Sequence, residues 1–332
     1  MIKRCLYIVT LLALASCASL RHGNIAVPKD VESKNQVKEI STEKQPELKE
    51  ITIVAPSVSK AELEAKPEVP AKPETKKGPT KKTRKKEVAA PPQELKKIAA
   101  PFSVGEIFKM DLYFIGIKAA TLTVEVKPFV EINGKKMFHF TGIAETSSLM
   151  ALIYKVYNVI DTYVDYDTFV PVKMTLTMDE SKQNVSMVLN YDHKDGKSHF
   201  WKKRIDKDKN ITEINRVDDL TPMAQDMFSS LYYVRMLPLK VGEKYKFVIH
   251  DNGKNWTLII DVVKEEKVWT RLGAVDTLLL HPTAERDGEK FTKGSMYLWV
   301  TNDEKKIPVK FEAEVRIGSM KGIIKDYIKG QE

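Results

Sequence analysis

The stretch Val172-Lys173-Met174-Thr175-Leu176-Thr177-Met178 alternates apolar and polar side chains at every step. Successive side chains of a β-strand point to opposite faces of its sheet, so this alternation predicts a strand with one apolar and one polar face. The stretch 307–317 repeats the pattern, as do the shorter runs 122–126, 185–191 and 256–262. Strands with a single buried face are typical of antiparallel sheets.

Turn-forming pairs separate these runs and tolerate the positive φ angles of tight hairpins. They are Asn133-Gly134, Asp195-Gly196, Asn252-Gly253 and Asp287-Gly288. We expect about eleven to thirteen strands, with Pro308 at a strand start or a sheet edge. The predicted fold is mainly β: an antiparallel, strongly curved sheet, barrel or half-barrel with one packed amphipathic helix. A two-sheet β-sandwich is the alternative.

One segment has helical rather than strand periodicity. Thr221-Pro222 is typical of an N-cap followed by proline at the first helical position. Apolar residues then recur every three or four positions, namely Met223, Met227, Leu231 and Val234. We predict an amphipathic helix over 222–236 that packs on the sheet, and a shorter helix over 147–153.

The composition divides the chain of 332 residues into three parts. Residues 18–100 contain nine prolines and 30 charged residues but no Phe, Tyr or Trp. Such a segment buries too little apolar surface to offset the entropy of ordering it. We predict a disordered Lys/Pro/Glu-rich tether over 18–100 and a β domain over 101–332, which begins where the aromatic residues return.

Residues 1–17 have the order of a secretory signal peptide. Lys3 and Arg4 precede the apolar run 6–14, and Leu14-Ala15-Ser16-Cys17 follows. This last stretch resembles the lipobox of bacterial lipoproteins. The resemblance implies that Cys17 is acylated, for example with palmitate, becomes the first mature residue and holds the protein to a membrane. No Asp follows Cys17, and in this the sequence resembles lipoproteins that are sorted to the outer membrane. The resemblance implies an outer-membrane protein that faces the periplasm. An ordinary signal peptide with a chance cysteine is the alternative.

Charge and cysteine content exclude several functions. The chain has 54 Lys and Arg against 45 Asp and Glu, but the excess lies in residues 1–100. The β domain is therefore nearly neutral, and we expect no nucleic acid as a partner. Both cysteines, Cys5 and Cys17, precede residue 18, so the domain has no disulfide and no thiolate metal site.

A basic run interrupts the predicted tether. It comprises Lys76, Lys77, Lys81, Lys82, Arg84, Lys85 and Lys86. We interpret it as a solvated linker, with contact to an anionic envelope polymer or to lipid headgroups as the alternative.

Motifs of catalysis are missing: there is no HExxH, P-loop, strand-linked GxGxxG or GxSxG. The best carboxylate cluster is Asp161, Asp165 and Asp167, which would share one side of a strand and could bind a hard cation. A solvent-facing strand explains the same pattern. His193 and His199 are expected on opposite faces of a two-residue hairpin, where they could not share a metal. We expect no metal and no cofactor.

Methionines recur in the predicted sheet and helix. Met174, Met178, Met187, Met223 and Met227 offer the adaptable surface that suits variable apolar ligands. They could line a cavity for an apolar or amphipathic ligand, but ordinary core packing is the preferred explanation.

Three stretches carry a family resemblance. They are Gly105 to Ala120, Asp226 to Glu243 and Trp299 to Lys310, and in order and spacing they resemble the bacterial family of unknown function DUF3108, found in exported proteins. Ala120 stands where the family has a small turn glycine. The resemblance implies a periplasm-facing, mainly antiparallel β domain without assigned activity or catalytic residues.

Together these features predict a non-enzymatic, lipid-anchored envelope protein that binds an apolar or amphipathic ligand or an envelope partner. The alternative is a hydrolase of envelope glycans or lipids that acts through Asp161, Asp165 or Asp167.

Overall fold

The computed structural model describes residues 25–40, 50–60, 95–287, 289–290, 294–314 and 318–331. Within them the chain forms nineteen strands and three short helices. The helices are α2 (Lys29–Glu32), α3 (Ser148–Ala151) and α4 (Ser229–Arg235). The strands before the main domain are β1 (Val37–Glu39), β2 (Glu50–Val54), β3 (Ser57–Lys60) and β4 (Leu95–Ala99).

The remaining strands follow in two groups, before and after α4. The first group is β5 (Ile107–Phe114), β6 (Ile117–Ile132), β7 (Lys135–Thr146), β8 (Val156–Asp165), β9 (Pro171–Glu180), β10 (Gln183–Asp192), β11 (Lys197–Asp206) and β12 (Ile211–Asp219). The second group is β13 (Glu243–Asp251), β14 (Lys254–Thr270), β15 (Gly273–Arg286), β16 (Glu289–Lys290), β17 (Met296–Thr301), β18 (Pro308–Glu314) and β19 (Ser319–Ile328).

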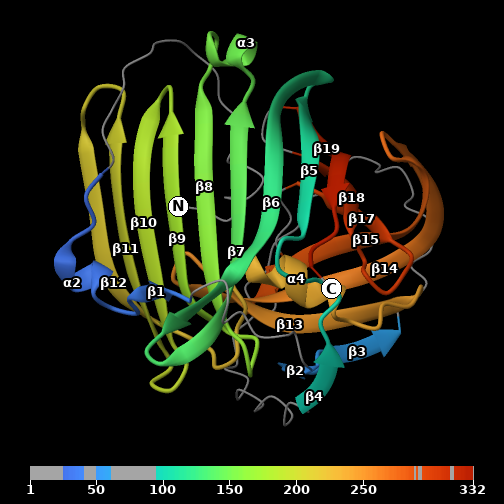
Figure 1. The fold of residues 1–332 in the computed structure, drawn as a ribbon, viewed down its shortest axis with the longest axis horizontal. Coiled ribbons are helices and arrows are strands. Elements are labelled where there is room, and N and C mark those ends of the chain that lie inside the picture. The colour runs from blue at the N-terminus through green and yellow to red at the C-terminus, as the bar shows by residue number, and fades with distance from the viewer. Residues whose placement is uncertain are drawn as a thin grey trace, which may run out of the picture.

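Antiparallel hairpins join neighbours within each group, and β19 pairs with β5 to join the groups into one sheet. In that joint Ile323 of β19 lies opposite Asp111 of β5. The sheet curves so strongly that β7–β12 and β13–β15 run in clearly different directions, with α4 between them (Figure 1). The predicted curved antiparallel β fold is confirmed, and the strands of both groups belong to a single sheet rather than to a sandwich of two.

Three of the four predicted two-residue hairpins form. Asn133-Gly134 and Asn252-Gly253 both have two positive φ angles between paired strands, and Asp287 begins the turn between β15 and β16. The prediction for Asp195-Gly196 is wrong in register: Asp192 pairs with Lys197, so the loop has four residues. An Asx turn explains the longer loop, because the Asp192 carboxylate accepts the Lys194 and Asp195 N–H groups at 3.1 and 2.9 Å.

The predicted helix over 222–236 is shorter than expected and begins at Ser229. Residue Met223 has a positive φ of 63°, which no helix allows. Gln225 instead bonds to β13, accepting from His250 N–H at 2.7 Å and donating to Val248 at 3.0 Å. Sheet pairing therefore competes successfully with helix formation over 221–227. The short helix expected over 147–153 forms as α3, with Ser147 as its N-cap.

Three stretches of the predicted tether are ordered in the structure, so a disordered tether over all of 18–100 is wrong for residues 25–40, 50–60 and 95–100. Strand β1 pairs with β6 and β3 pairs with β13, while β2 pairs with β4. Val31 of α2 packs on Val188 and Trp201, which are 3% and 1% exposed on the outer side of the sheet. The composition of this segment suggested that the entropy lost on ordering would keep it disordered. Its buried apolar contacts with the domain offset that entropy.

Several predicted features lie outside the described residues. These are Cys17 with the leader, and the basic run comprising Lys76, Lys77, Lys81, Lys82, Arg84, Lys85 and Lys86. In the part of the chain that the structure describes, no helix is long and apolar enough to cross a membrane.

Candidate ligand cavity

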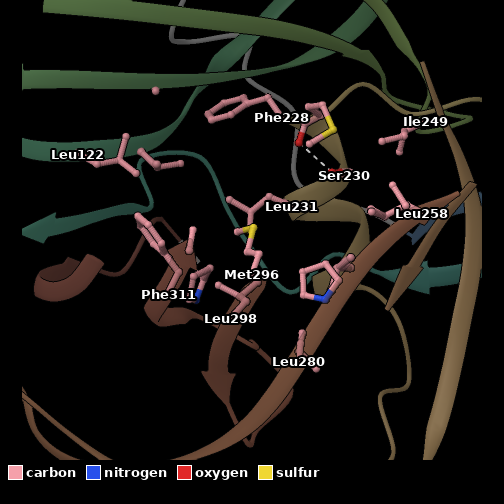
Figure 2. Close-up of a pocket in the computed structure, with 18 of the residues that line it drawn as sticks. Leu122, Phe228, Ser230, Leu231, Ile249, Leu258, Leu280, Met296, Leu298 and Phe311 are labelled. Carbon is pink, nitrogen blue, oxygen red and sulfur yellow. Dashed lines mark hydrogen bonds between the residues drawn. The ribbon is translucent and has the colours of Figure 1, made fainter. Parts of the chain in front are cut away.

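An apolar cavity of about 570 Å³ lies between the two strand groups, beside α4. Both groups and the helix contribute to its wall, and their side chains converge on one space (Figure 2). Labelled examples are Leu122 from β6, Leu231 from α4, Leu258 from β14 and Leu298 from β17. A space of this size falls in the range of about 300–1,000 Å³ typical of small-molecule sites.

Strand alternation produces the apolar wall. Phe108, Met110 and Leu112 are successive inward residues of β5, and Leu258 and Ile260 are successive inward residues of β14. Because each strand turns every second side chain inward, the inner faces of the two groups present apolar surface to one another. The same alternation that predicts the strands thus also builds the cavity.

Helix α4 closes one side of the cavity through Phe228, Leu231 and Val234. The ring of Phe228 lies against Gly142 of β7, where an added Cβ would stand 2.8 Å from the Phe228 Cζ atom. Glycine at this position lets the helix approach the sheet closely. Ser230 is a polar exception, but its hydroxyl is used within the helix, donating to the Met227 carbonyl at 2.8 Å (Figure 2).

A buried carboxylate anchors the start of α4. Asp226 is fully buried and accepts from the N–H groups of Phe228 and Ser229 at 2.7 and 2.6 Å. The Thr162 hydroxyl of β8 donates to its second oxygen. Burial raises the pKa of Asp226, and the hydrogen bonds oppose that rise. The carboxylate thereby satisfies the helix N–H groups and ties the helix to the first strand group.

The cavity has few ionisable groups in its described lining. Asp251, the last residue of β13, and Glu314, the last of β18, are the carboxyl groups. Burial first, and then the nearby Asp226, raise the pKa of Asp251 to about 7, while Lys202 acts against that rise. His281 also lines the cavity, and its ring stacks on Tyr297 at 4.9 Å.

The predicted carboxylate cluster does not form a site. Asp161 of β8 contacts His139 of β7, with 2.8 Å between the Asp161 Oδ1 and His139 Nε2 atoms. Asp165 ends that strand and accepts the N–H groups of Asp167 and Thr168 at 3.0 and 2.9 Å, which makes it a turn residue. Strand β8 stops before Asp167, so the alternation that would align the three carboxylates ends too early. None of the three lines the cavity.

The predicted methionines lie in different parts of the structure. Met227 lines the cavity. Met223 lies outside the lining, in the irregular turn before α4, and Met174, Met178 and Met187 pack in separate apolar clusters between strands. Met110 and Met296, which were not in the predicted set, also line it, and leucine is the most frequent lining residue. Periodicity identifies the inward face of a strand, but not which inward residues adjoin a cavity.

His193 and His199 contact different parts of the structure. His193 lies in the four-residue loop and its Nε2 contacts the Pro171 carbonyl at 2.8 Å, whereas His199 contacts Lys34 at 3.1 Å. Across the described ranges, no group of three or more His, Cys, Asp or Glu side chains could hold a metal ion.

Comparison with known proteins identifies a protein family. The model of the protein family of unknown function DUF3108 matches residues 108–325. No curated protein matches the chain.

Solved structures show distant likeness. A β-barrel-like protein of unknown-function family DUF1849 from Brucella abortus aligns with a TM-score of 0.42 and 10% identity, over 70% of this chain and 100% of its own. A presumed exported protein with a YmcC-like fold from Bacteroides fragilis aligns with a TM-score of 0.31 and 13% identity, over 69% and 98%. A presumed lipoprotein from Parabacteroides distasonis aligns at 0.30 and 11%, also over 69% and 98%. Because the family model covers most of the β domain, the chain belongs to the DUF3108 family of proteins of unknown function.

Proposed function

We propose that this protein is a non-enzymatic binding protein of the bacterial cell envelope that holds an apolar or amphipathic ligand in its cavity. The observation that carries the proposal is the cavity of about 570 Å³ with an apolar wall drawn from both strand groups and α4. Apolar ligand surface that enters it leaves water, which favours binding by roughly 25 cal/mol for each Å² buried.

The carboxylates of the hydrolase alternative, Asp161, Asp165 and Asp167, do not line the cavity. Two carboxyl groups would have to flank one scissile bond, but Asp161 and Asp165 are engaged by His139 and by a turn, away from the cavity. The hydrolase alternative through these residues therefore finds no support in the cavity, whose apolar wall favours binding.

The binding test uses a neutral apolar dye, N-phenyl-1-naphthylamine, whose fluorescence rises in apolar surroundings. We expect the mature chain to bind the dye and Leu231→Trp to weaken binding by roughly tenfold or more, because the larger ring fills the cavity. Leu149→Trp is the matched control, since Leu149 lies on α3 with 71% of its side chain exposed.

A folded Leu231→Trp protein, checked by circular dichroism, that binds the dye as tightly as the unmodified chain would refute the cavity as the site. Failure of the unmodified chain to bind any apolar probe would refute the binding function itself.

The membrane anchor is a separate part of the proposal. It rests on the lipobox-like stretch that ends at Cys17, and it places the protein at the outer membrane, facing the periplasm. We expect Cys17→Ser to release the protein from membranes into the soluble fraction, while Cys5→Ser leaves it bound. Membrane retention of Cys17→Ser after a high-salt wash would remove the anchor.

Contact between the basic run and an anionic envelope polymer stays a prediction. Replacing the seven cations of 76–86 by Gln should lower co-sedimentation with cell-wall material, most clearly at low salt. Unchanged co-sedimentation would leave the run as a solvated linker.

A further inference from the structure

The ionisable side chains among the described cavity lining are two carboxyl groups and one histidine, His281. Among the described lining residues the charged side chains are Asp251 and Glu314, and no Lys or Arg is present. They are the last residues of two different strands, β13 and β18. Glu314 is also held in place, because its Oε2 accepts the Ser295 N–H at 3.3 Å. A negatively charged ligand group would therefore meet carboxyl groups without a balancing cation.

Asp251 is the acceptor best placed to meet a ligand. It follows Ile249 on the inward face of β13, so its carboxyl group projects into the same cavity. Within the described chain the Asp251 carboxyl group makes no hydrogen bond or ion pair, in contrast to the carboxylate of Asp226, whose oxygens are both used. A carboxyl group in apolar surroundings gains most from a partner that donates a hydrogen bond to it.

The charged and titratable groups around Asp251 favour the same kind of ligand. Asp226 repels its negative form, and Lys202 attracts it more weakly. The hydroxyl of Tyr191 is buried without a hydrogen-bond partner in the described structure. Burial first, and then the carboxylates of Asp226 and Asp251, raise its pKa. Lys202 is the only cation in this set, and it does not line the cavity. The neighbourhood therefore offers acceptors and negative potential rather than an anion site.

We infer that the ligand is an amphipathic molecule whose polar end donates a hydrogen bond and carries no negative charge, a hydroxyl or an amine, received by Asp251. Anionic amphiphiles such as fatty acids are disfavoured at this site. The inference rests on the proposed function, because it assigns the polar end of a ligand held in the same cavity.

The test compares three competitors with one chain length: dodecylamine, dodecan-1-ol and dodecanoate, each below its micelle concentration. They displace N-phenyl-1-naphthylamine from the mature full-length protein at about pH 8.5 and about pH 5.5. At the higher pH we expect dodecylamine to bind roughly tenfold or more tightly than dodecanoate, with dodecan-1-ol between them. At the lower pH Asp251 is protonated, and the advantage of the amine over the alcohol should shrink.

Asp251→Asn should reduce the amine's advantage to about threefold or less, while it leaves the affinity for dodecan-1-ol nearly unchanged. Glu312→Gln is the matched control, because it removes the same charge from β18 at a half-exposed side chain outside the cavity lining. Equal or tighter binding of dodecanoate would overturn the inference while the proposed binding function stands. If Asp251→Asn fails to fold, the pH dependence of the unmodified protein decides. If the unmodified protein does not bind the dye at all, both the inference about Asp251 and the proposed binding function are overturned.

Discussion

Arg235, at the end of α4, holds Glu106 in a buried bidentate ion pair. Its Nη1 and Nη2 lie 2.6 and 2.9 Å from the two carboxylate oxygens, and the side chains are 0% and 3% exposed. The guanidinium also donates to the Lys305 carbonyl, and the Tyr327 hydroxyl donates to Glu106. The pair therefore connects the helix to the segment before β5 and to the last strand, where the two strand groups join.

We expect Arg235→Ala to lower the free energy of unfolding by about 3–5 kcal/mol, because it leaves the Glu106 carboxylate buried without its cation. Urea unfolding followed by circular dichroism measures this loss. Lys197→Ala is the control: its pair with Asp219 is 49% and 87% exposed, and such exposed pairs contribute about 0–1 kcal/mol. Similar losses for both variants would contradict a structural role for the buried pair.

Asp251 makes stability depend on pH. Its pKa is raised to about 7 by burial and by Asp226, so the folded state holds the proton more tightly than the unfolded state. Stability from this group is present below the unfolded value of 3.8 and is lost as pH rises to about 7. We expect Asp251→Asn to be more stable than the unmodified protein by about 1–3 kcal/mol at about pH 8.5, with little difference at about pH 4.5. A difference independent of pH between these values would refute the assignment.

Val31 tests whether the docked part of the predicted tether is stably bound. It is 7% exposed and packs on Trp201, so Val31→Asp places a charge in an apolar contact and should cost about 1–3 kcal/mol. Hydrogen exchange over 29–39 should become faster, and Trp201 emission should shift to longer wavelength. Val58→Asp, at a side chain 53% exposed on β3, is the control. Unchanged exchange in Val31→Asp would show that this segment does not remain docked in solution.

Gly142 tests the contact between the helix and the sheet. A Cβ at this position would lie 2.8 Å from Phe228 and 3.0 Å from Ile160, so Gly142→Ala must displace the ring that closes the cavity. We expect a loss of about 1–3 kcal/mol in thermal or urea unfolding, together with weaker dye binding. Removal of a glycine without such a clash would instead stabilise the protein by up to about 1 kcal/mol. A gain of that kind would contradict the close packing.

Local patterns in the sequence predicted the alternating strands and most of the turns, although the described residues form nineteen strands rather than about eleven to thirteen. Alternation over 172–178 correctly places Met174, Leu176 and Met178 on a buried face, because side-chain direction in a strand depends only on position parity. Asn133-Gly134 forms its hairpin for an equally local reason, since these residues adopt positive φ at little cost.

Features that depend on distant partners were predicted incorrectly or not at all. The helix begins at Ser229 rather than at residue 222 because Gln225 finds a backbone partner on β13. Residues 25–40 are ordered because Trp201 and Val188 offer them an apolar surface, which the composition of the segment itself cannot reveal.

The sequence by itself determined that the domain is an antiparallel sheet with alternating faces, because each strand encodes its own buried side. Only the tertiary structure decided that β19 closes against β5 and that the inward faces leave an apolar cavity beside the packed core. Curvature and packing set the distance between those faces, and both arise from contacts between residues far apart in the chain. Asp251 acquires its significance in the same way: its raised pKa results from the apolar wall and from Asp226, neither of which is its neighbour in sequence.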